Sequence, residues 1–294
     1  MDYYKEIKKE LVDNEIYKKV KDYSKNKYEL QKYYNVGKLL YDAGKHYGEG
    51  IIKEYSRKLS TEVGKGYSKR NLWLMLQFYN LKEKVQTLSA QLSWSHYVEL
   101  LILDDVVKIN YYINIIEEQN LSVRKLRQKI KNKEYERLPE ETKNKLISNE
   151  KNNIKDYVKD PIIIKNKNNY EELSEKVLQK IILEDLENFL DELGKGFTFI
   201  KSEYPIKLGE RYNYIDLLLF NIDYNCYVVV ELKVTELKKK HIGQIEVYMN
   251  YIDENIRRIT QDKTIGIIIV IENNKYIIKY ASDKRILSRT YELV

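Results

Sequence analysis

The chain has 294 residues, of which 43% are hydrophobic and 33% are charged. It is long enough for two domains of ordinary size and apolar enough to bury a core. The net charge of +7 is uneven: residues 1–150 carry 29 Lys and Arg against 22 Asp and Glu, whereas residues 151–294 carry 23 of each. A basic first half favours a polyanionic partner such as nucleic acid, although a solvated basic surface without such a partner gives the same count.

The rarer residue types exclude several kinds of site. Cys226 is the single cysteine, which excludes a disulfide framework and a cysteine-based zinc site. The three histidines, His46, His96 and His241, are far apart and form no metal motif. Because no apolar run reaches membrane-spanning length and Met1–Glu10 is charged, we expect a cytoplasmic protein with no membrane partner.

Residues 1–136 have the periodicity of helices. Apolar side chains recur at three and four positions with charges between them, and glycines interrupt the pattern at Gly48, Gly50, Gly64 and Gly66. One such stripe consists of Val36, Leu39, Leu40 and Ala43. We therefore expect a helical domain over 1–136.

Within this domain, two expected helices at 51–63 and 68–79 flank the short glycine-containing turn 64–67, which is the pattern of a helix-turn-helix. Ser68 is a favourable amino-terminal cap for the second helix, whose first residues would meet the bases in the major groove. The expected DNA contacts are Lys65, Ser68, Lys69, Arg70 and Asn71. Helical hairpins are also common without DNA, so a packing domain that forms oligomers or binds a protein is the alternative.

The segment 137–169 differs in composition from both of its neighbours. It is rich in Lys, Glu and Asn, and it has few large apolar residues before Pro161. We interpret it as a charged linker. A basic cluster precedes it, which we interpret as a solvated helix face or a phosphate contact; its members are Arg124, Lys125, Arg127, Lys129, Lys131 and Lys133.

Residues 170–294 alternate between helical and strand-like patterns. A helix is expected from Glu171 to Leu193, where Gly194 ends it, and a second from Lys239 to Asn255. The expected strands are 197–200, 212–220, 226–234, 264–271 and 276–280, with a hairpin turn at 223–225. This order of elements predicts an α/β domain built on a central mixed sheet.

Two of these strands carry charges where apolar residues are expected. Asp216 interrupts one apolar run, and Glu231 and Lys233 interrupt the next. A buried carboxylate needs a cation or strong hydrogen bonds. Glu231 and Lys233 share one face of their strand, so three charges converge if Asp216 lies on that face of the adjacent strand. Two carboxylates suit Mg²⁺, which activates water, and a lysine stabilises the transition state of phosphodiester hydrolysis. The alternative is a salt-bridged pair at a strand end with Asp216 at the sheet rim.

The residues around these charges resemble a known family. Tyr214-Ile215-Asp216 followed by Val229-Val230-Glu231-Leu232-Lys233 resembles the PD-(D/E)XK nuclease signature. The flanking segments resemble the YhcG-type PD-(D/E)XK family and its helical amino-terminal domain; they are 189–197, 226–229, 243–244 with Tyr248, 47–48, 59–60, 66–68, 71–72, 92–96, 121–126 and 135–138. The resemblance implies an α+β two-domain protein: an all-α helix-turn-helix-like domain, then an α/β restriction-endonuclease-like domain over 170–294.

The resemblance also implies roles for individual residues. Asp216 and Glu231 would bind the metal, Mg²⁺ or Mn²⁺, and Lys233 would be the catalytic lysine. Gln244 and Tyr248 match a Gln-x-x-x-Tyr element on the following helix, where they share one face and would reach the metal-bound water or a phosphate. The alternatives from the residues alone are an exposed helix residue for Gln244 and a core aromatic for Tyr248, which is the commoner outcome in so tyrosine-rich a chain.

One departure from the family pattern concerns a further acid on the first helix of the domain. At that position the chain has Gln179, and Glu175 and Glu184 lie nearby without clearly replacing it. A second metal ion is therefore in doubt. The expected function is a Mg²⁺-dependent DNA endonuclease. Its oligomeric state is open, and a homodimer is one alternative, since cutting both strands of a duplex usually needs two active sites. The alternatives are a catalytically inactive DNA-binding or protein-assembly module with the nuclease fold, and a plain protein-interaction scaffold.

Overall fold

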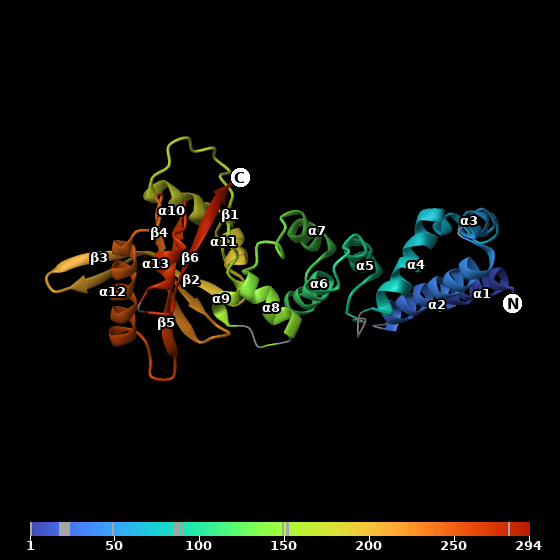
Figure 1. The fold of residues 1–294 in the computed structure, drawn as a ribbon, viewed down its shortest axis with the longest axis horizontal. Helices are drawn as coiled ribbons and strands as arrows, with labels where there is room; N and C mark the ends of the chain where they lie inside the picture. The colour runs from blue at the N-terminus through green and yellow to red at the C-terminus, as the bar shows by residue number, and fades with distance from the viewer. Residues whose placement is uncertain are drawn as a thin grey trace. The chain divides into compact units, whose positions relative to one another are not determined.

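A computed structural model describes residues 2–17, 24–48, 50–84, 89, 91–148, 150, 153–281 and 283–294. The chain divides into two compact units, Met1–Tyr135 and Glu136–Val294. The first unit is helical, and the second is a mixed sheet with helices on both faces (Figure 1). The predicted fold class is therefore confirmed.

The first unit packs its helices around an apolar core. Its elements are α1 (Tyr3–Tyr17), α2 (Ser24–Tyr47), α3 (Ile51–Glu62), η1 (Lys65–Tyr67), α4 (Lys69–Lys82), α5 (Trp94–Leu100), α6 (Val106–Gln119) and α7 (Val123–Lys131). Helices α2 and α4 approach each other closely at Gly37, where a Cβ would collide with the backbone carbonyl of Met75. Leu40, Leu59 and Leu72 are fully buried in this core, as the 3.6-residue periodicity predicted.

The second unit holds the sheet. Its elements are α8 (Glu140–Ser148), α9 (Ile154–Tyr157), β1 (Ile162–Ile164), α10 (Glu175–Glu184), α11 (Leu186–Leu193), β2 (Phe197–Leu208), β3 (Arg211–Asn221), β4 (Cys226–Leu232), α12 (Lys239–Asn255), β5 (Asp262–Val270), α13 (Lys275–Lys279) and β6 (Ile286–Leu293). The six strands lie in the order β1-β6-β5-β4-β3-β2. Strands β1, β6, β5 and β4 run parallel to one another, whereas β2, β3 and β4 form an antiparallel meander.

Helices cover the two faces of the sheet because its central strands are apolar on both sides. Val228 and Val230 of β4 pack in the core that includes Leu178 and Phe189 of α10 and α11. Val229 points to the opposite face, into a core with Ile245 and other residues of α12. Strand β4 is thus held in the middle of the domain, with both faces protected from water.

Four secondary-structure predictions need correction. The expected strand 276–280 is the short helix α13, which the side chain of Asn274 caps. The edge of the sheet on that side is formed by β6 and β1, which were not predicted. The expected long helix 171–193 is two helices that meet at Asp185, whose φ of −137° and ψ of 54° are not helical. Strand β2 runs to Leu208, well beyond the predicted end at residue 200.

The segment 137–169 is not a free linker but part of the second unit. It contains α8, α9 and β1, and β1 pairs in parallel with β6. The guanidinium of Arg137 forms a buried ion pair with Glu192 of α11 and also donates to the Pro161 carbonyl at 2.7 Å. Its many charges made this segment resemble a solvated connector, but several of them are paired inside the fold.

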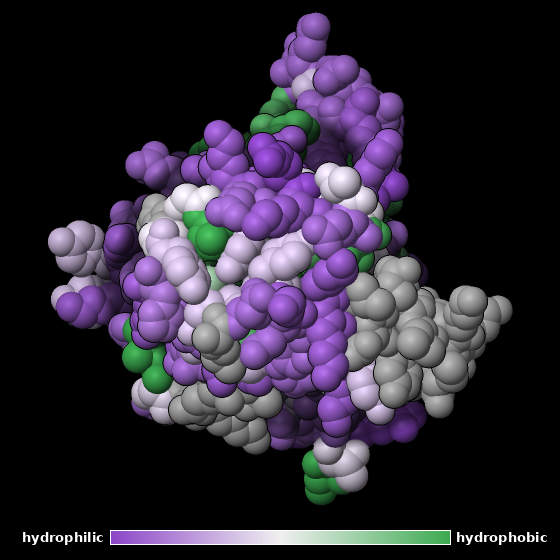
Figure 2. All heavy atoms as spheres, turned by 90° about the vertical axis from the view of Figure 1, so that its right-hand side faces the viewer, coloured by the Kyte–Doolittle hydropathy of each residue, from purple (hydrophilic) through white to green (hydrophobic). Residues whose placement is uncertain are grey.

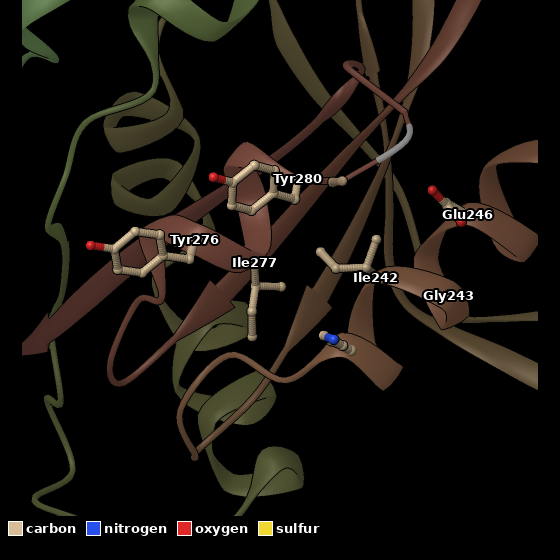
Figure 3. Close-up of a pocket in the computed structure, with 8 residues that line it drawn as sticks. Ile242, Gly243, Glu246, Tyr276, Ile277 and Tyr280 are labelled. Atoms are coloured by element: carbon tan, nitrogen blue, oxygen red, sulfur yellow. The ribbon is translucent and has the colours of Figure 1, made fainter.

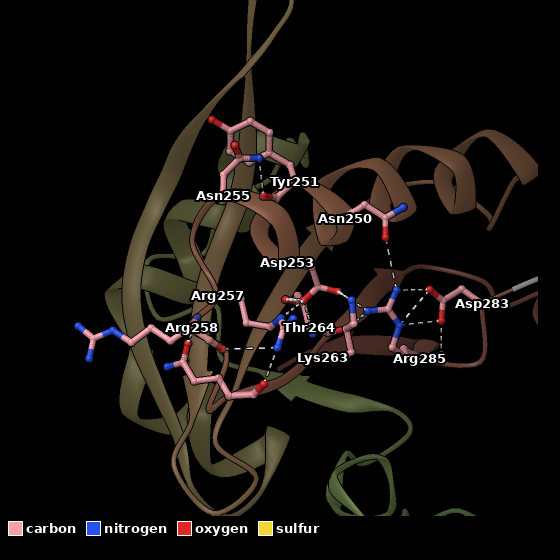
Figure 4. A network of polar contacts seen from close by, with 11 residues as sticks. Asn250, Tyr251, Asp253, Asn255, Arg257, Arg258, Lys263, Thr264, Asp283 and Arg285 are labelled. Atoms are coloured by element: carbon pink, nitrogen blue, oxygen red, sulfur yellow. Dashed lines mark hydrogen bonds and ion pairs between the residues drawn. The ribbon is translucent and has the colours of Figure 1, made fainter.

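A polar network fixes the end of α12 to the strands beside it. Asp253, whose side chain is 3% exposed, accepts hydrogen bonds from the backbone and hydroxyl of Thr264 and from Arg285 (Figure 4). Burial alone would raise the pKa of Asp253, but these hydrogen bonds outweigh it and lower the pKa. Arg285 also pairs with Asp283, so the buried carboxylate is fully satisfied.

The surface is consistent with the high charge content. Figure 2 shows one face of the molecule, on which hydrophilic residues predominate and hydrophobic ones appear in scattered groups. Within the described ranges, no helix is both long enough and apolar enough to cross a membrane.

Candidate active site

The pairing of β3 with β4 brings the two strand carboxylates together. The antiparallel register pairs Leu217 with Val230, so Asp216 and Glu231 are the next residues along each strand. Asp216 Oδ2 accepts a hydrogen bond from the Leu232 amide at 2.7 Å. The convergence of the charges expected from the sequence is confirmed, although their catalytic role stays a prediction.

Glu231 is the most deeply buried of these charged residues. Its side chain is 2% exposed. Its Oε2 lies 3.3 Å from Lys233 Nζ, whereas its Oε1 is buried and no described residue gives it a hydrogen bond. Burying a carboxylate oxygen without a partner is costly. The oxygen therefore marks a position where a cation would be favourable.

A third carboxylate reaches the site from α10. Glu175, in the first turn of that helix, places Oε2 3.3 Å from Lys233 Nζ. Lys233 is therefore held between Glu231 and Glu175. The sequence left the role of Glu175 open. The available signal was its position about one turn before Gln179, since residues four apart share a helix face.

The side chain of Gln179, at the position where the family pattern has an acid, forms a hydrogen bond within the fold. Its Nε2 donates to the backbone carbonyl of Asp216 at 2.8 Å, which ties α10 to the strand that carries the carboxylate. Glu184 lies elsewhere and accepts from Asn168 and Tyr170. In the described part of the chain, no group of three or more His, Cys, Asp or Glu residues is arranged to hold a metal ion.

The electrostatics of the site follow from burial and from the closeness of like charges. Burial, and then the Asp216 carboxylate, raise the pKa of Glu231 to about 8. Burial likewise raises the pKa of Asp216. Burial lowers the pKa of Lys233, but the carboxylates of Glu231, Asp216 and Glu175 outweigh it, and the net effect is a raised pKa. Lys233 is thus held in its charged form, while the two carboxylates compete for protons.

Gln244 and Tyr248 lie on α12, which packs against the sheet beside β4. The Gln244 amide donates to the Tyr248 hydroxyl at 3.1 Å. Tyr248 is 5% exposed, and burial raises its pKa, with further increases from the charges of Glu231 and Asp216. The two residues form a pair as their spacing predicted; a contact with substrate stays a prediction.

The turn between α3 and α4 contains the expected DNA-contacting residues. Ser68 caps α4, with its hydroxyl accepting from the Asn71 amide at 3.3 Å, and the Asn71 side chain donates to the Gly66 carbonyl at 2.7 Å. The predicted cap is confirmed, and both side chains stabilise the turn. Lys65, Lys69 and Arg70 are exposed, as contacts to phosphate would require.

Helix α4 also carries an exposed aromatic that sequence reasoning missed. Trp73 is 50% exposed and lies one turn after Lys69, on the same helix face. No local pattern marked Trp73 as exposed, since it stands beside the buried Leu72 in an apolar stretch of the helix.

A separate pocket of about 620 Å³ lies between α12 and α13 (Figure 3). It is lined by Lys239, Ile242, Gly243, Glu246, Tyr276, Ile277, Tyr280 and Ala281. None of the three strand charges is among these residues, so this pocket is distinct from the carboxylate site.

A mixed sheet with an acid on one strand, a glutamate and a lysine on the next, and a glutamine on the following helix defines the PD-(D/E)XK class of nuclease. Residues 155–294 match the family model of the YhcG PDDEXK nuclease domain, and residues 7–137 match that of the DUF1016 N-terminal domain. The chain therefore belongs to the YhcG-type PD-(D/E)XK nuclease family, and the resemblance seen in the sequence is confirmed.

Individual proteins are also similar to parts of the chain. The chain is 24% identical over 271 residues to "Putative nuclease YhcG" of Escherichia coli strain K12, across 77% of this chain and 70% of that protein. Two solved structures are similar over 43% of this chain and 48% of theirs. They are a repair endonuclease from Pyrococcus abyssi, with 23% identity and a TM-score of 0.30, and an EndoMS–dsDNA complex, with 20% identity and a TM-score of 0.29. The chain thus spans about half the length of these structures.

Proposed function

We propose that the protein is a Mg²⁺-dependent DNA endonuclease that hydrolyses phosphodiester bonds at Asp216, Glu231 and Lys233. The observation that carries the proposal is the buried Oε1 of Glu231, which has no hydrogen-bond partner in the described chain and lies in a site with a second carboxylate and a lysine. A site that served only to stabilise the fold would be expected to satisfy this oxygen.

The donor atoms fit a hard divalent cation such as Mg²⁺ or Mn²⁺. Asp216 and Glu231 offer carboxylate oxygens from adjacent strands, and Mg²⁺ prefers oxygen ligands and keeps several waters. Such an ion, when bound, supplies an activated water and stabilises charge on the phosphate. Its positive charge would also offset the cost of burial, which raises the pKa of both carboxylates, and the effect of the Asp216 charge, which raises the pKa of Glu231 further.

The proposed role of Lys233 is electrostatic. Glu231 and Glu175 each hold its Nζ at 3.3 Å, and its raised pKa keeps it protonated at neutral pH. A fixed ammonium group stabilises the negative charge that develops on the phosphoryl oxygens in the transition state. Gln244 and Tyr248, paired on α12, are proposed to orient the attacking water or a phosphate oxygen.

The helical domain is proposed to bind the DNA. Lys65, Lys69 and Arg70 are exposed around the start of α4, where they suit phosphate contacts. Ser68 and Asn71 are proposed to hold the turn and to contact the DNA with their remaining polar atoms. A homodimer would bring two sites to one duplex.

Plasmid cleavage tests the proposal. Purified wild-type protein should nick or linearise plasmid DNA with Mg²⁺ or Mn²⁺, whereas Asp216→Asn and Lys233→Ala should lower the rate at least a hundredfold, since each removes part of the charge stabilisation. Asp262→Asn is the matched control, because this exposed carboxylate lies at the start of β5, away from the site. Cleavage by the Asp216 and Lys233 variants at the wild-type rate would refute the assignment.

The second candidate is a catalytically inactive DNA-binding or assembly module. It is favoured by the absence, among the described residues, of a cluster of three metal-ligating side chains. It predicts that wild-type protein binds DNA yet cuts neither plasmid, branched nor single-stranded DNA with either metal.

A further inference from the structure

Strand β3 extends beyond the part of the sheet that supports it. It pairs with β4 only from Leu217 to Asn221, whereas its pairing with β2 continues to Arg211. Residues 204–215, which we call the hairpin arm, therefore form a two-stranded projection. Figure 1 shows the β2–β3 hairpin extending past α12.

The two faces of the hairpin arm differ. On one face Ile206 and Ile215, at most 1% exposed, pack in the core that contains α12. On the other face, Tyr212 and Tyr214 are 63% and 51% exposed. Directly opposite them on β2 stand Lys207 and Pro205, which are also exposed. The opposite face of the arm is thus fixed by packing in the core, whereas the tyrosine side chains bury little of their own surface.

The arm is continuous with the carboxylate site. Tyr214 is two residues before Asp216 on the same strand, and a strand rises about 3.3 Å per residue, so Tyr214 and Tyr212 lie roughly 7 and 13 Å along β3 from Asp216. Glu231 is two residues after Val229 and so points to the α12 face, whereas the rings are on the opposite face of the arm; a DNA strand that contacts both would cross from one face to the other along β3.

We propose that Tyr212 and Tyr214 stack on successive unpaired nucleotides beside the bond that is cut, so that the substrate is DNA with a single-stranded segment at the cleavage site. This inference rests on the proposed function. The spacing of the rings carries it: they are about 6.6 Å apart along the strand, whereas stacked bases in a duplex are about 3.4 Å apart. Each ring can take one base only where the bases are separated.

The charges and the backbone of the arm agree with this occupant. Lys207 lies 6.0 Å from the centroid of the Tyr212 ring, and Arg211 is exposed next to it. Both cations are placed for backbone phosphates, although Glu203 and Glu210 reduce the local excess of positive charge. Base stacking on an aromatic tolerates any sequence, because every base has a π-face.

The arm is poorly suited to adding a strand from another protein. β2 is the edge strand of the sheet, but Pro205 lacks an amide donor and Glu203 has a φ of 49° that interrupts regular pairing. Both features protect an edge against further strands. The exposed tyrosines are therefore better explained by a ligand that stacks.

Equilibrium binding without metal tests this inference independently of catalysis. Fluorescence anisotropy in EDTA would compare a labelled single-stranded oligonucleotide with the matched duplex. Tyr212→Ala and Tyr214→Ala should each weaken binding of the single strand roughly tenfold and that of the duplex much less. Tyr212→Phe and Tyr214→Phe should bind like wild type, because the ring remains. Tyr276→Ala, which removes a tyrosine that is 73% exposed on α13, is the control.

The outcomes separate the two proposals. The inference would be overturned by an unchanged single-strand affinity in both alanine variants. It would also be overturned if the phenylalanine variants, or the Tyr276→Ala control, lost as much affinity as the alanine variants. If the tyrosines bind single strands but the wild-type protein cuts no DNA with either metal, the proposed function fails and the stacking surface stands. If the wild type cuts duplex DNA and the tyrosine substitutions leave single-strand affinity unchanged, the proposed function stands and the stacking surface fails.

Discussion

At the scale of single residues, Glu231 shows how a site differs from a stabilising contact. Its carboxylate is almost fully buried, one oxygen is without a partner among the described residues, and the pKa is raised to about 8 by burial and by Asp216. An ion pair with Lys233 does not compensate for this, because Lys233 is shared with Glu175. The fold therefore tolerates an incompletely hydrogen-bonded carboxyl group, whose ionisation is unfavourable, at the position proposed to bind metal.

This leads to a prediction about stability and pH. Because the folded-state pKa of Glu231 lies above the value of 4.5 for a free glutamate, its contribution to stability is complete below that value and is lost as the pH rises through about 8. Asp216, also raised, acts in the same direction. In EDTA, raising the pH from 5 to 8 should lower the thermal unfolding midpoint of the wild type more than that of Glu231→Gln.

Thermal unfolding scans at half-unit pH steps measure this difference directly. Other titrating groups, such as His96 and His241, are common to both proteins and cancel in the comparison. Parallel curves for the wild type and Glu231→Gln would show that Glu231 ionises normally in the folded protein.

At the scale of elements, the sequence predicted best where periodicity and burial agree. The predicted helix 239–255 is α12, and the predicted strands 212–220 and 226–234 correspond closely to β3 and β4. These three elements hold four of the five candidate catalytic residues, and the fifth, Lys233, directly follows β4. Their strands are apolar on both faces, so each charged residue was conspicuous.

The missed elements depend on contacts that are distant in the sequence. Strand β6 contains Arg289, whose guanidinium donates to the carbonyls of Val158 and Lys155, more than 130 residues away. No local pattern indicates such a partner. The break at Asp185 has no glycine or proline to mark it, and Tyr276–Tyr280 alternates in a way that fits either a strand or one helical turn.

The approach of α2 to α4 gives a prediction with a built-in control. A Cβ at Gly37 would collide with the Met75 carbonyl, whereas nothing lies within 4 Å of a Cβ at Gly44 of the same helix. Gly37→Ala should therefore destabilise the helical unit by about 1–3 kcal/mol. Gly44→Ala should stabilise it by about 0.5–1 kcal/mol through helix propensity.

Urea unfolding followed by circular dichroism compares the two glycine variants. Opposite signs of the change in unfolding free energy are expected. A stabilising Gly37→Ala would mean that the two helices are not packed at this distance in solution.

At the scale of the whole molecule, charge and chemistry are divided between two units. The unit Met1–Tyr135 carries 26 Lys and Arg against 18 Asp and Glu, whereas the unit Glu136–Val294, which holds the carboxylate site, carries 26 against 27. This division is expected if the first unit binds the phosphate backbone and the second unit hydrolyses it. The sequence showed the division from composition alone, although it could not show that 137–169 folds with the second unit.

Salt dependence of DNA binding tests the role of the helical unit. If Lys65, Lys69 and Arg70 contact phosphates, each alanine substitution should reduce the slope of log affinity against log salt by about 1. Lys53→Ala, on the exposed side of α3, should leave the slope unchanged. Anisotropy titrations over a series of NaCl concentrations provide the slopes. If all four variants had the slope of the wild type, α4 would not belong to the proposed interface.

The most direct test of the central claim, that Asp216 and Glu231 together bind a divalent cation, is calorimetric titration of Mn²⁺ into the metal-free protein. The wild type should bind Mn²⁺ with measurable heat and release protons, more of them near pH 6 than near pH 8, because Glu231 must lose its proton to act as a ligand. Asp216→Asn and Glu231→Gln should each abolish the binding, while Asp262→Asn should retain it. Mn²⁺ binding of equal affinity in the wild type and both site variants would contradict the account.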